Sequence, residues 1–589
     1  MEWFCLPRPD SPSVFGAMLD RSAGTFRLGP DECVVPSQRR YVPGTLVLET
    51  TWQTPDGWLV VQDCLVLDRW HGGPRSERFR RAPGEFVGGQ CLLRTVNCME
   101  GDVEVVLNCM PAFDYGRESV GWTYGDDDYG TVTAAPPSGP ELRLTTSMRL
   151  DLMGPRAFGH VHLSAGERAF CALTWGDGAP PADPAAAHDV MHETEHHWRR
   201  WLKEGVFPDH PWRSYLERSA LTLKGLSHAP SGAVLAAATT SLPEAPGGER
   251  NWDYRYTWVR DSAFMLWGLF TLGFDWEAYE YFAFLIEETT QTELQIMYGI
   301  GGERELTEST LDHLHGYGGA QPVRIGNGAY NQRQHDVWGM LVDSIAIHAG
   351  KGLTKELSSA GWTWIETLVE GAIRNWKEPD RGIWEVRGEP QHFTASKAMC
   401  WVALDRGILL AKERGDEPRS AQWQAVADEI HADVCEHGVD ERGVFTQTYD
   451  GDTLDASLLL LPIMGFLPPD DERIRKTVLA IADELTEHGL VLRYRTEHTD
   501  DGLGGKEGTF TICSFWLVLA LTLIGELGRA RSLCERLLSL ASPLQLYAEE
   551  LDSESGRHLG NFPQAFTHLS LITAVAGLIR AEEGDVSNE

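Results

Sequence analysis

The sequence NWDYRYTWVRDSAFMLWGLFTLGFDWEAYEYFAFLIEETT, residues 251–290, carries the pattern that decides the fold. Polar and aromatic residues end a long loop at Asp261, and the apolar residues that follow recur with the period of a helix over 261–273. A link of about two residues then leads to a second helix, expected over 276–290. The expected unit of this part of the chain is therefore a long loop, a helix, a short link and another helix.

This unit recurs from about residue 212 onward and predicts twelve helices, among them one over 454–462 and a last one over 563–582 with Asn561 as a candidate N-cap. Connections after the odd-numbered helices run about 16 to 40 residues, and those after the even-numbered ones about one to eight. Short links make neighbouring helices antiparallel, so every long loop leaves from the same end. Six such pairs predict an (α/α)6 barrel over residues 212–589, with an active site among its long loops.

The first part of the chain has the period of strands instead. Residues 45–52 and 58–67 alternate apolar and polar around the turn Pro55-Asp56-Gly57, which predicts a hairpin. A second turn is expected at Glu100-Gly101-Asp102, between two runs rich in Val and Leu. We therefore expect an antiparallel β-sandwich over residues 1–184 and a linker helix within 185–211.

Composition excludes several classes of protein. The 51 Lys and Arg against 86 Asp and Glu give a net charge of −35, which argues against nucleic acid as a partner. The 21 Trp suit both large cores and sugar binding. The 11 Cys stand singly, which favours reduced, mostly buried thiols. Without a visible secretory signal or an apolar run of about 20 residues, we expect a soluble cytoplasmic protein with no membrane partner.

The long loops also bring several carboxylates to one mouth, which suits hydrolysis of a glycosidic bond. Two facing carboxyl groups are needed there, one to protonate the leaving oxygen and one to take a proton from water. Glu385 follows Trp384 in the third long loop, and an apolar wall beside a carboxyl group favours its protonated form. Glu549 lies in the sixth long loop and could supply the second carboxylate.

The runs NWDYRYTWVRDSAFMLWGL, GIWEVRGEPQHFTASKAMCWVALDR, YAEELDSESGRHLGNFPQAFTHLSLITA and WFCLPRPDSPSVF make nearly the whole chain similar to glycoside hydrolase family fifteen. The family contains glucoamylases, glucodextranase-like and isomaltose-cleaving enzymes, and trehalases. The resemblance implies an N-terminal β-supersandwich, a linker helix and a catalytic (α/α)6 barrel. It also implies an exo-acting, inverting hydrolase that releases β-glucose from the non-reducing end of an α-glucoside.

The same motifs imply the roles of individual residues. Glu385 matches the general acid and Glu549 the general base. The resemblance also assigns six residues to substrate binding: Arg260 and Asp261 on the hydroxyls of the terminal glucose, Trp258 and Trp384 beside the sugar, Arg493 in the pocket wall, and Glu507 at the pocket edge.

The chain departs from the family where the leaving group would bind. Fungal members have a second Glu directly after the general acid, but residue 386 here is Val. Contacts to the leaving group must therefore differ. The second long loop, residues 299–330, is expected to form the wall of that part of the site, through His313, His315, Tyr317, Arg324 and Asn327.

We expect no metal and no cofactor. The pairs His313 with His315 and His196 with His197 lack further ligands at suitable spacing, and residues 502–507 do not form a phosphate loop. The expected partner is a small oligosaccharide or disaccharide, with isomalto- or malto-oligosaccharides placed before the alternative, trehalose. A phosphorylase and a non-catalytic sugar-binding or regulatory barrel remain rival interpretations, and the oligomeric state is left open.

Overall fold

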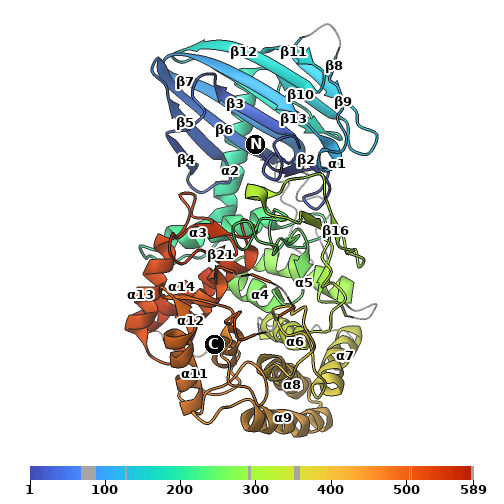
Figure 1. Ribbon diagram of the computed structural model, residues 1–589, viewed down its shortest axis with the longest axis vertical. Coiled ribbons are helices and arrows are strands. Elements are labelled where there is room, and N and C mark those ends of the chain that lie inside the picture. The colour runs from blue at the N-terminus through green and yellow to red at the C-terminus, as the bar shows by residue number, and fades with distance from the viewer. Residues whose placement is uncertain are drawn as a thin grey trace. The chain divides into compact units, whose positions relative to one another are not determined.

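The computed structural model divides the chain into two units, the first built of strands and the second of helices (Figure 1). Met1–Gly205, Leu311–Gly319 and Pro543–Gln545 form the first unit, and Val206–Thr310, Ala320–Ser542 and Leu546–Glu589 form the second. The structure describes residues 1–67, 88–125, 129–289, 294–350, 359–499, 501, 502, 504, 505 and 507–584.

The first unit is a sandwich of antiparallel strands organised around one long strand, β7 (Gly88–Met110). The first part of β7 pairs with β6 (Gly57–Leu67) and β13 (Arg168–Trp175), and its last part pairs with β3 (Thr25–Pro30) and β12 (Arg156–Ser164). Six further strands extend these two layers: β4 (Gln38–Tyr41), β5 (Leu48–Gln53), β8 (Thr123–Tyr124), β9 (Thr131–Ala134), β10 (Leu142–Thr146) and β11 (Arg149–Met153). The strands β1 (Phe4–Cys5) and β2 (Ser13–Phe15) pair with each other in a separate sheet. The predicted hairpin forms as β5 and β6.

The expected turn at residues 100–102 is wrong, because β7 continues through it. Gly101 has φ +70°, and a Cβ added there would lie 2.0 Å from the carbonyl oxygen of Asp56. Glycine thus permits a bend at which β7 leaves one layer of the sandwich and enters the other. The bend resembles a turn in the sequence because both features need the same residue type.

The alternation along β7 supplies two separate cores. Leu92 and Val96 point into the core between the two layers, whereas Leu93 packs with Met191 of helix α2 (Pro184–Leu202) on the opposite face. The α2 helix begins where the side chain of Asp183 accepts hydrogen bonds from two backbone N–H groups. The helix expected within 185–211 is therefore present.

The second unit contains the twelve expected helices. Six of them, α4, α6, α8, α10 with its preceding 3-10 turn, α12 and α14, contact one another in this order, and α14 returns to α4. The other six pack around this closed ring, which confirms the (α/α)6 barrel. Their bounds are α3 Arg213–Leu226, α4 Ser262–Thr271, α5 Asp275–Thr289, α6 Asp336–His348, α7 Ser359–Asn375, α8 Thr394–Arg414, α9 Glu417–His437, α10 Leu460–Ile463, α11 Glu472–Glu484, α12 Thr511–Leu523, α13 Leu527–Ser539 and α14 Ala565–Glu583.

The composition of each helix explains its place in the barrel. Ten of the 13 residues of the inner helix α12 are buried, and its sequence TICSFWLVLALTL is apolar on nearly every side. In the outer helix α11 only five of 13 residues are buried, and they repeat along one face. A helix that is apolar all round must be covered on all sides, whereas an amphipathic helix can face water.

The eighth and the last helix differ from expectation in form and in capping. The eighth helix is a 3-10 turn over Ala456–Leu459 followed by the four residues of α10, where Pro462 removes a backbone donor. The last helix starts at Ala565, and Asn561 does not cap it. The Asn561 side chain instead accepts a hydrogen bond from Thr239 and donates one to the carbonyl oxygen of Trp252, so it fixes a loop.

The composition predicts mostly buried thiols and no membrane-spanning helix. All 11 cysteines lie within the described ranges and are thiols rather than disulfides, and nine of them are buried. Within the described ranges, no helix combines the length and the apolar character that a membrane crossing requires.

Candidate active site

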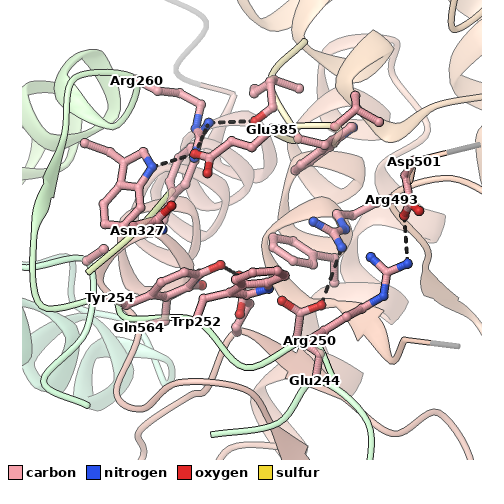
Figure 2. A pocket seen from close by; sticks show the side chains of 18 of the residues that line it. Glu244, Arg250, Trp252, Tyr254, Arg260, Asn327, Glu385, Arg493, Asp501 and Gln564 are labelled. Atoms are coloured by element: carbon pink, nitrogen blue, oxygen red, sulfur yellow. Dashed lines mark hydrogen bonds and ion pairs between the residues drawn. The ribbon is translucent and has the colours of Figure 1, made fainter. Parts of the chain in front are cut away.

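A pocket opens among the long loops of the second unit. Five of the six long loops supply lining residues, and within the described residues the loop before α10 supplies none. In Figure 2, Glu385 and Arg260 lie on one side of the pocket, and Glu244, Arg250 and Arg493 lie on another.

Glu385 reaches this pocket from a turn with unusual backbone geometry. Its φ is +59°, a left-handed conformation that costs a non-glycine residue about 1–3 kcal/mol. Its Oε1 atom accepts a 2.6 Å hydrogen bond from the indole of Trp258 and two weaker ones, at 3.4 Å, from the guanidinium of Arg260. From the described residues its Oε2 atom accepts none. One carboxyl oxygen is therefore held by the protein and the other is open to a ligand.

Trp384 lies in the same pocket but does not hold the carboxyl group of Glu385. Its indole N–H donates a 2.8 Å hydrogen bond to Asp455, and its ring packs against Phe510. Trp258, from the first long loop, binds this carboxyl group instead, through its indole N–H. The pairing of a Trp with Glu385 thus comes from a distant loop and not from its neighbour in the sequence.

Arg260 and Asp261 line the pocket side by side, but their ion pair is loose at 3.8 Å. Arg260 instead donates a 2.6 Å hydrogen bond to the carbonyl oxygen of Ile383, which ties it to the loop of Glu385. The Oδ1 atom of Asp261 has no hydrogen-bond partner among the described residues. Burial raises the pKa of Asp261 to about 7, against the opposing effect of Arg260.

Glu549 lines the pocket from the sixth long loop and is 1% exposed. Its Oε1 atom accepts a 2.5 Å hydrogen bond from the hydroxyl of Tyr254, and its Oε2 atom has no partner among the described residues. Burial raises the pKa of Glu549 well above its ordinary value, and the nearby charge of Glu244 adds to this rise. Like Glu385, this carboxyl group has one oxygen held and one free.

Arg493 lines the pocket, whereas Glu507 lies behind it. The side chain of Glu507 is 2% exposed and accepts hydrogen bonds from both Nε and Nη2 of Arg493, the former at 3.1 Å. The expected place of Glu507 at the pocket edge is therefore wrong. A buried carboxylate in this position fixes the guanidinium group through a two-point contact.

The second long loop contributes less to the pocket than expected. Asn327 lines it, and Arg324 packs its guanidinium 4.6 Å from the ring of Trp252, which also lines it. His313 and His315 belong instead to the first unit. There they bind the carbonyl oxygen of Tyr115 and the carboxyl group of Asp20, and Tyr317 is 40% exposed in the same segment. The expectation for His313, His315 and Tyr317 is therefore wrong.

Several pocket residues were not singled out from the sequence. Tyr254 and Trp252 stand in the quoted run of residues 251–261, and the aromatic density of that run is the signal that indicates them. Glu244, Arg250 and Asp501 gave none, because loops rich in glycine and charge are usually solvent-exposed. Their burial is visible only in the folded chain.

Three buried carboxyl groups, of Glu244, Glu507 and Glu550, each have an oxygen within 4.8 Å of the others and could together hold a cation. Two guanidinium groups already approach this cluster. Arg493 binds Glu507 and lies 3.6 Å from Glu244, and Arg250 lies 3.6 Å from Glu507. Arginine thus supplies positive charge at the place where a metal ion would supply it.

Comparisons with known proteins agree with this architecture. The family model "Glycosyl hydrolases family 15" matches residues 211–576, and the model "Trehalase-like, N-terminal" matches residues 1–72. A trehalase from Mycobacterium tuberculosis is 60% identical, over 99% of this chain and 87% of its own length. A trehalase from Thermoplasma volcanium is 34% identical, over 99% of this chain and 90% of its own length.

A solved structure supports the fold independently. A bacterial glucoamylase in complex with acarbose superposes with a TM-score of 0.69 at 12% identity, covering 95% of this chain and 86% of its own. The match extends over strands and helices alike. Together, the family model and the near-full-length relatives show that this chain is a glycoside hydrolase and belongs to glycosyl hydrolases family 15.

Proposed function

We propose that this chain is a trehalase, which hydrolyses α,α-trehalose to two molecules of glucose. The observation that carries the proposal is that Glu385 and Glu549 line one pocket, each with one carboxyl oxygen bonded by the protein and the other without a hydrogen-bond partner among the described residues. Relatives named trehalase, which match almost the whole chain, favour trehalose over the isomalto- or malto-oligosaccharides first expected.

In the proposed mechanism, Glu385 is the general acid and Glu549 the general base of a single displacement. As the bond from C1 to the glycosidic oxygen breaks, Glu385 gives its proton to that oxygen. A water molecule forms the new bond to C1 from the opposite face and gives a proton to Glu549. The attacked glucose is released as the β anomer and the leaving glucose as the α anomer, because only the attacked carbon is inverted.

Contacts of the two carboxyl groups support this division. Trp258 and Arg260 hold Oε1 of Glu385, so Oε2 could face the glycosidic oxygen. Tyr254 holds Oε1 of Glu549, so Oε2 could face the attacking water. Since a general base must be ionised and burial raises the pKa of Glu549, we expect kcat to fall as the pH is lowered.

The experiment is to incubate the protein separately with trehalose, isomaltose and maltotriose and to follow the glucose anomers by NMR. We expect trehalose to be consumed fastest, with equal amounts of α- and β-glucose at early times. Turnover of isomaltose or maltotriose without trehalose would contradict the proposed substrate. A requirement for phosphate would indicate a phosphorylase, and no turnover of any sugar would indicate a binding protein.

A further inference from the structure

The loop before α4 places a further carboxyl group, that of Glu244, in the pocket. Glu244 is 1% exposed and lines the pocket, and its Oε2 atom has no hydrogen-bond partner among the described residues. A buried polar atom without a hydrogen-bond partner costs free energy. Its presence in a pocket therefore indicates that a ligand supplies the missing hydrogen bond. The proposed mechanism does not use Glu244.

The cations nearest to Glu244 are engaged by other carboxylates. Arg493 makes its two-point contact with Glu507 and approaches Glu244 Oε2 only to 3.6 Å. Arg250 donates a 2.8 Å hydrogen bond to Asp501. Neither guanidinium group therefore satisfies Oε2, although both favour a negative charge in this part of the pocket.

The neighbouring residue, Trp252, is fixed from several sides. The guanidinium groups of Arg324 and Arg387 lie 4.6 and 5.0 Å from its ring, and Glu308 forms ion pairs with both arginines at 3.4 and 3.3 Å. A hydrogen bond from Trp252 and the charge of Arg493 act on Glu244, and burial outweighs both to raise its pKa to about 7. Glu244 thus lies beside a wall to which residues of three long loops contribute.

We propose that Glu244 is a further substrate-binding residue, whose Oε2 atom accepts a hydrogen bond from one hydroxyl group of the bound sugar and so selects sugars that carry this hydroxyl. The inference rests on the proposed function, which places a sugar in this pocket. A sugar without that hydroxyl leaves the buried oxygen unpaired, and sites of this kind discriminate strongly against the deoxy analogue.

The test uses D-glucose and its 2-, 3-, 4- and 6-deoxy analogues as probes, with binding measured by calorimetry. At pH 8.5, where a carboxyl group with a pKa of about 7 is ionised, the wild-type protein should bind one analogue at least about tenfold more weakly than glucose, as expected for a hydrogen bond to a charged group. Glu244→Ala should bind glucose as weakly as that analogue and no longer distinguish the two. Glu244→Gln, which keeps an acceptor oxygen at the same place, should show an intermediate ratio.

Glu550→Gln is the matched control, because Glu550 belongs to the same buried carboxylate cluster but does not line the pocket. This variant should keep the wild-type ratios of affinity for glucose and its deoxy analogues. The inference is overturned if Glu244→Ala distinguishes the analogues as wild type does, or if Glu550→Gln loses the same discrimination. If Glu244→Ala does not fold, Glu244→Gln decides instead: the inference is overturned if this variant has the wild-type ratio of affinities for glucose and the deoxy analogue. Trehalose turnover, measured in parallel, separates an incorrect substrate from an incorrect role for Glu244.

Discussion

The hydroxyl of Tyr254 lies 2.5 Å from Oε1 of Glu549, although the two residues are 295 positions apart in the sequence. The hydrogen bond joins the first long loop of the barrel to the sixth. Because Glu549 is almost completely buried, the bond fixes the direction of its second oxygen. A base that takes a proton from water needs such a fixed direction.

Replacing Tyr254 with Phe should therefore lower kcat for trehalose by about 10- to 100-fold, the loss expected for one hydrogen bond to a charged group. KM should change little, because the hydroxyl is bonded to Glu549 and not assigned to the sugar. Tyr256→Phe is a suitable control, since the Tyr256 hydroxyl bonds to Asp253 at 3.3 Å. Equal losses in the two variants would argue against a specific role for Tyr254.

The roles of Glu385 and Glu549 can be separated by changing the leaving group. Glu385→Gln and Glu549→Gln should each lower kcat for trehalose by at least about 10²-fold. Fluoride leaves without needing a proton, so Glu385→Gln should still hydrolyse α-glucosyl fluoride at close to the wild-type rate, whereas Glu549→Gln should not. The opposite result would exchange the two roles. If a variant keeps more than about a tenth of the wild-type kcat for trehalose, the replaced residue does not have the role assigned to it.

Most helices and strands could be predicted from the sequence because their periods record which side of each element is buried. The apolar α12 and the one-sided α11 differ in composition for this reason, and the difference places them in the inner and outer rings. Gly101 could not be interpreted in the same way. A glycine that bends a continuous strand and a glycine in a hairpin turn give the same local signal.

The site was harder to predict than the fold, because its contacts join distant loops. The sequence indicated Glu385 and Glu549 through their surroundings, but not that Trp258 would hold Glu385 or that Glu507 would lie behind Arg493. Such contacts depend on how the barrel brings loop ends together. Periodicity reports burial of an element and carries no information about partners across the barrel.

The buried Asp261 should make stability depend on pH. Its pKa is about 7 in the folded chain and near 3.8 when exposed, so the folded state holds the proton more tightly. Its contribution to stability is complete below about pH 4 and is lost as the pH rises through about 7. Three pKa units correspond to about 4 kcal/mol. As the pH rises from about 4 to about 7, the free energy of unfolding of wild type should therefore fall by up to about 4 kcal/mol more than that of Asp261→Asn.

Urea unfolding at pH 4.5 and pH 7.5 would measure this difference. Asp428→Asn provides the control, because Asp428 is exposed on α9 and should leave the pH dependence as in wild type. If Asp261→Asn and wild type lose the same stability between the two pH values, Asp261 is not the buried acid that we describe.

The bend in β7 leads to a prediction about the first unit. Gly101→Ala would place a Cβ 2.0 Å from the carbonyl oxygen of Asp56 and keep a non-glycine residue at φ +70°, so the strand or the neighbouring turn must move. The free energy of unfolding should fall by about 2 to 5 kcal/mol. Gly154→Ala separates the two causes, since Gly154 has φ +59° but no other atom within 4 Å of an added Cβ. Its free energy of unfolding should fall only by the cost of the left-handed backbone conformation, about 1 to 2 kcal/mol. Urea unfolding of both variants would test this, and equal losses would show that the approach of Asp56 does not require a glycine.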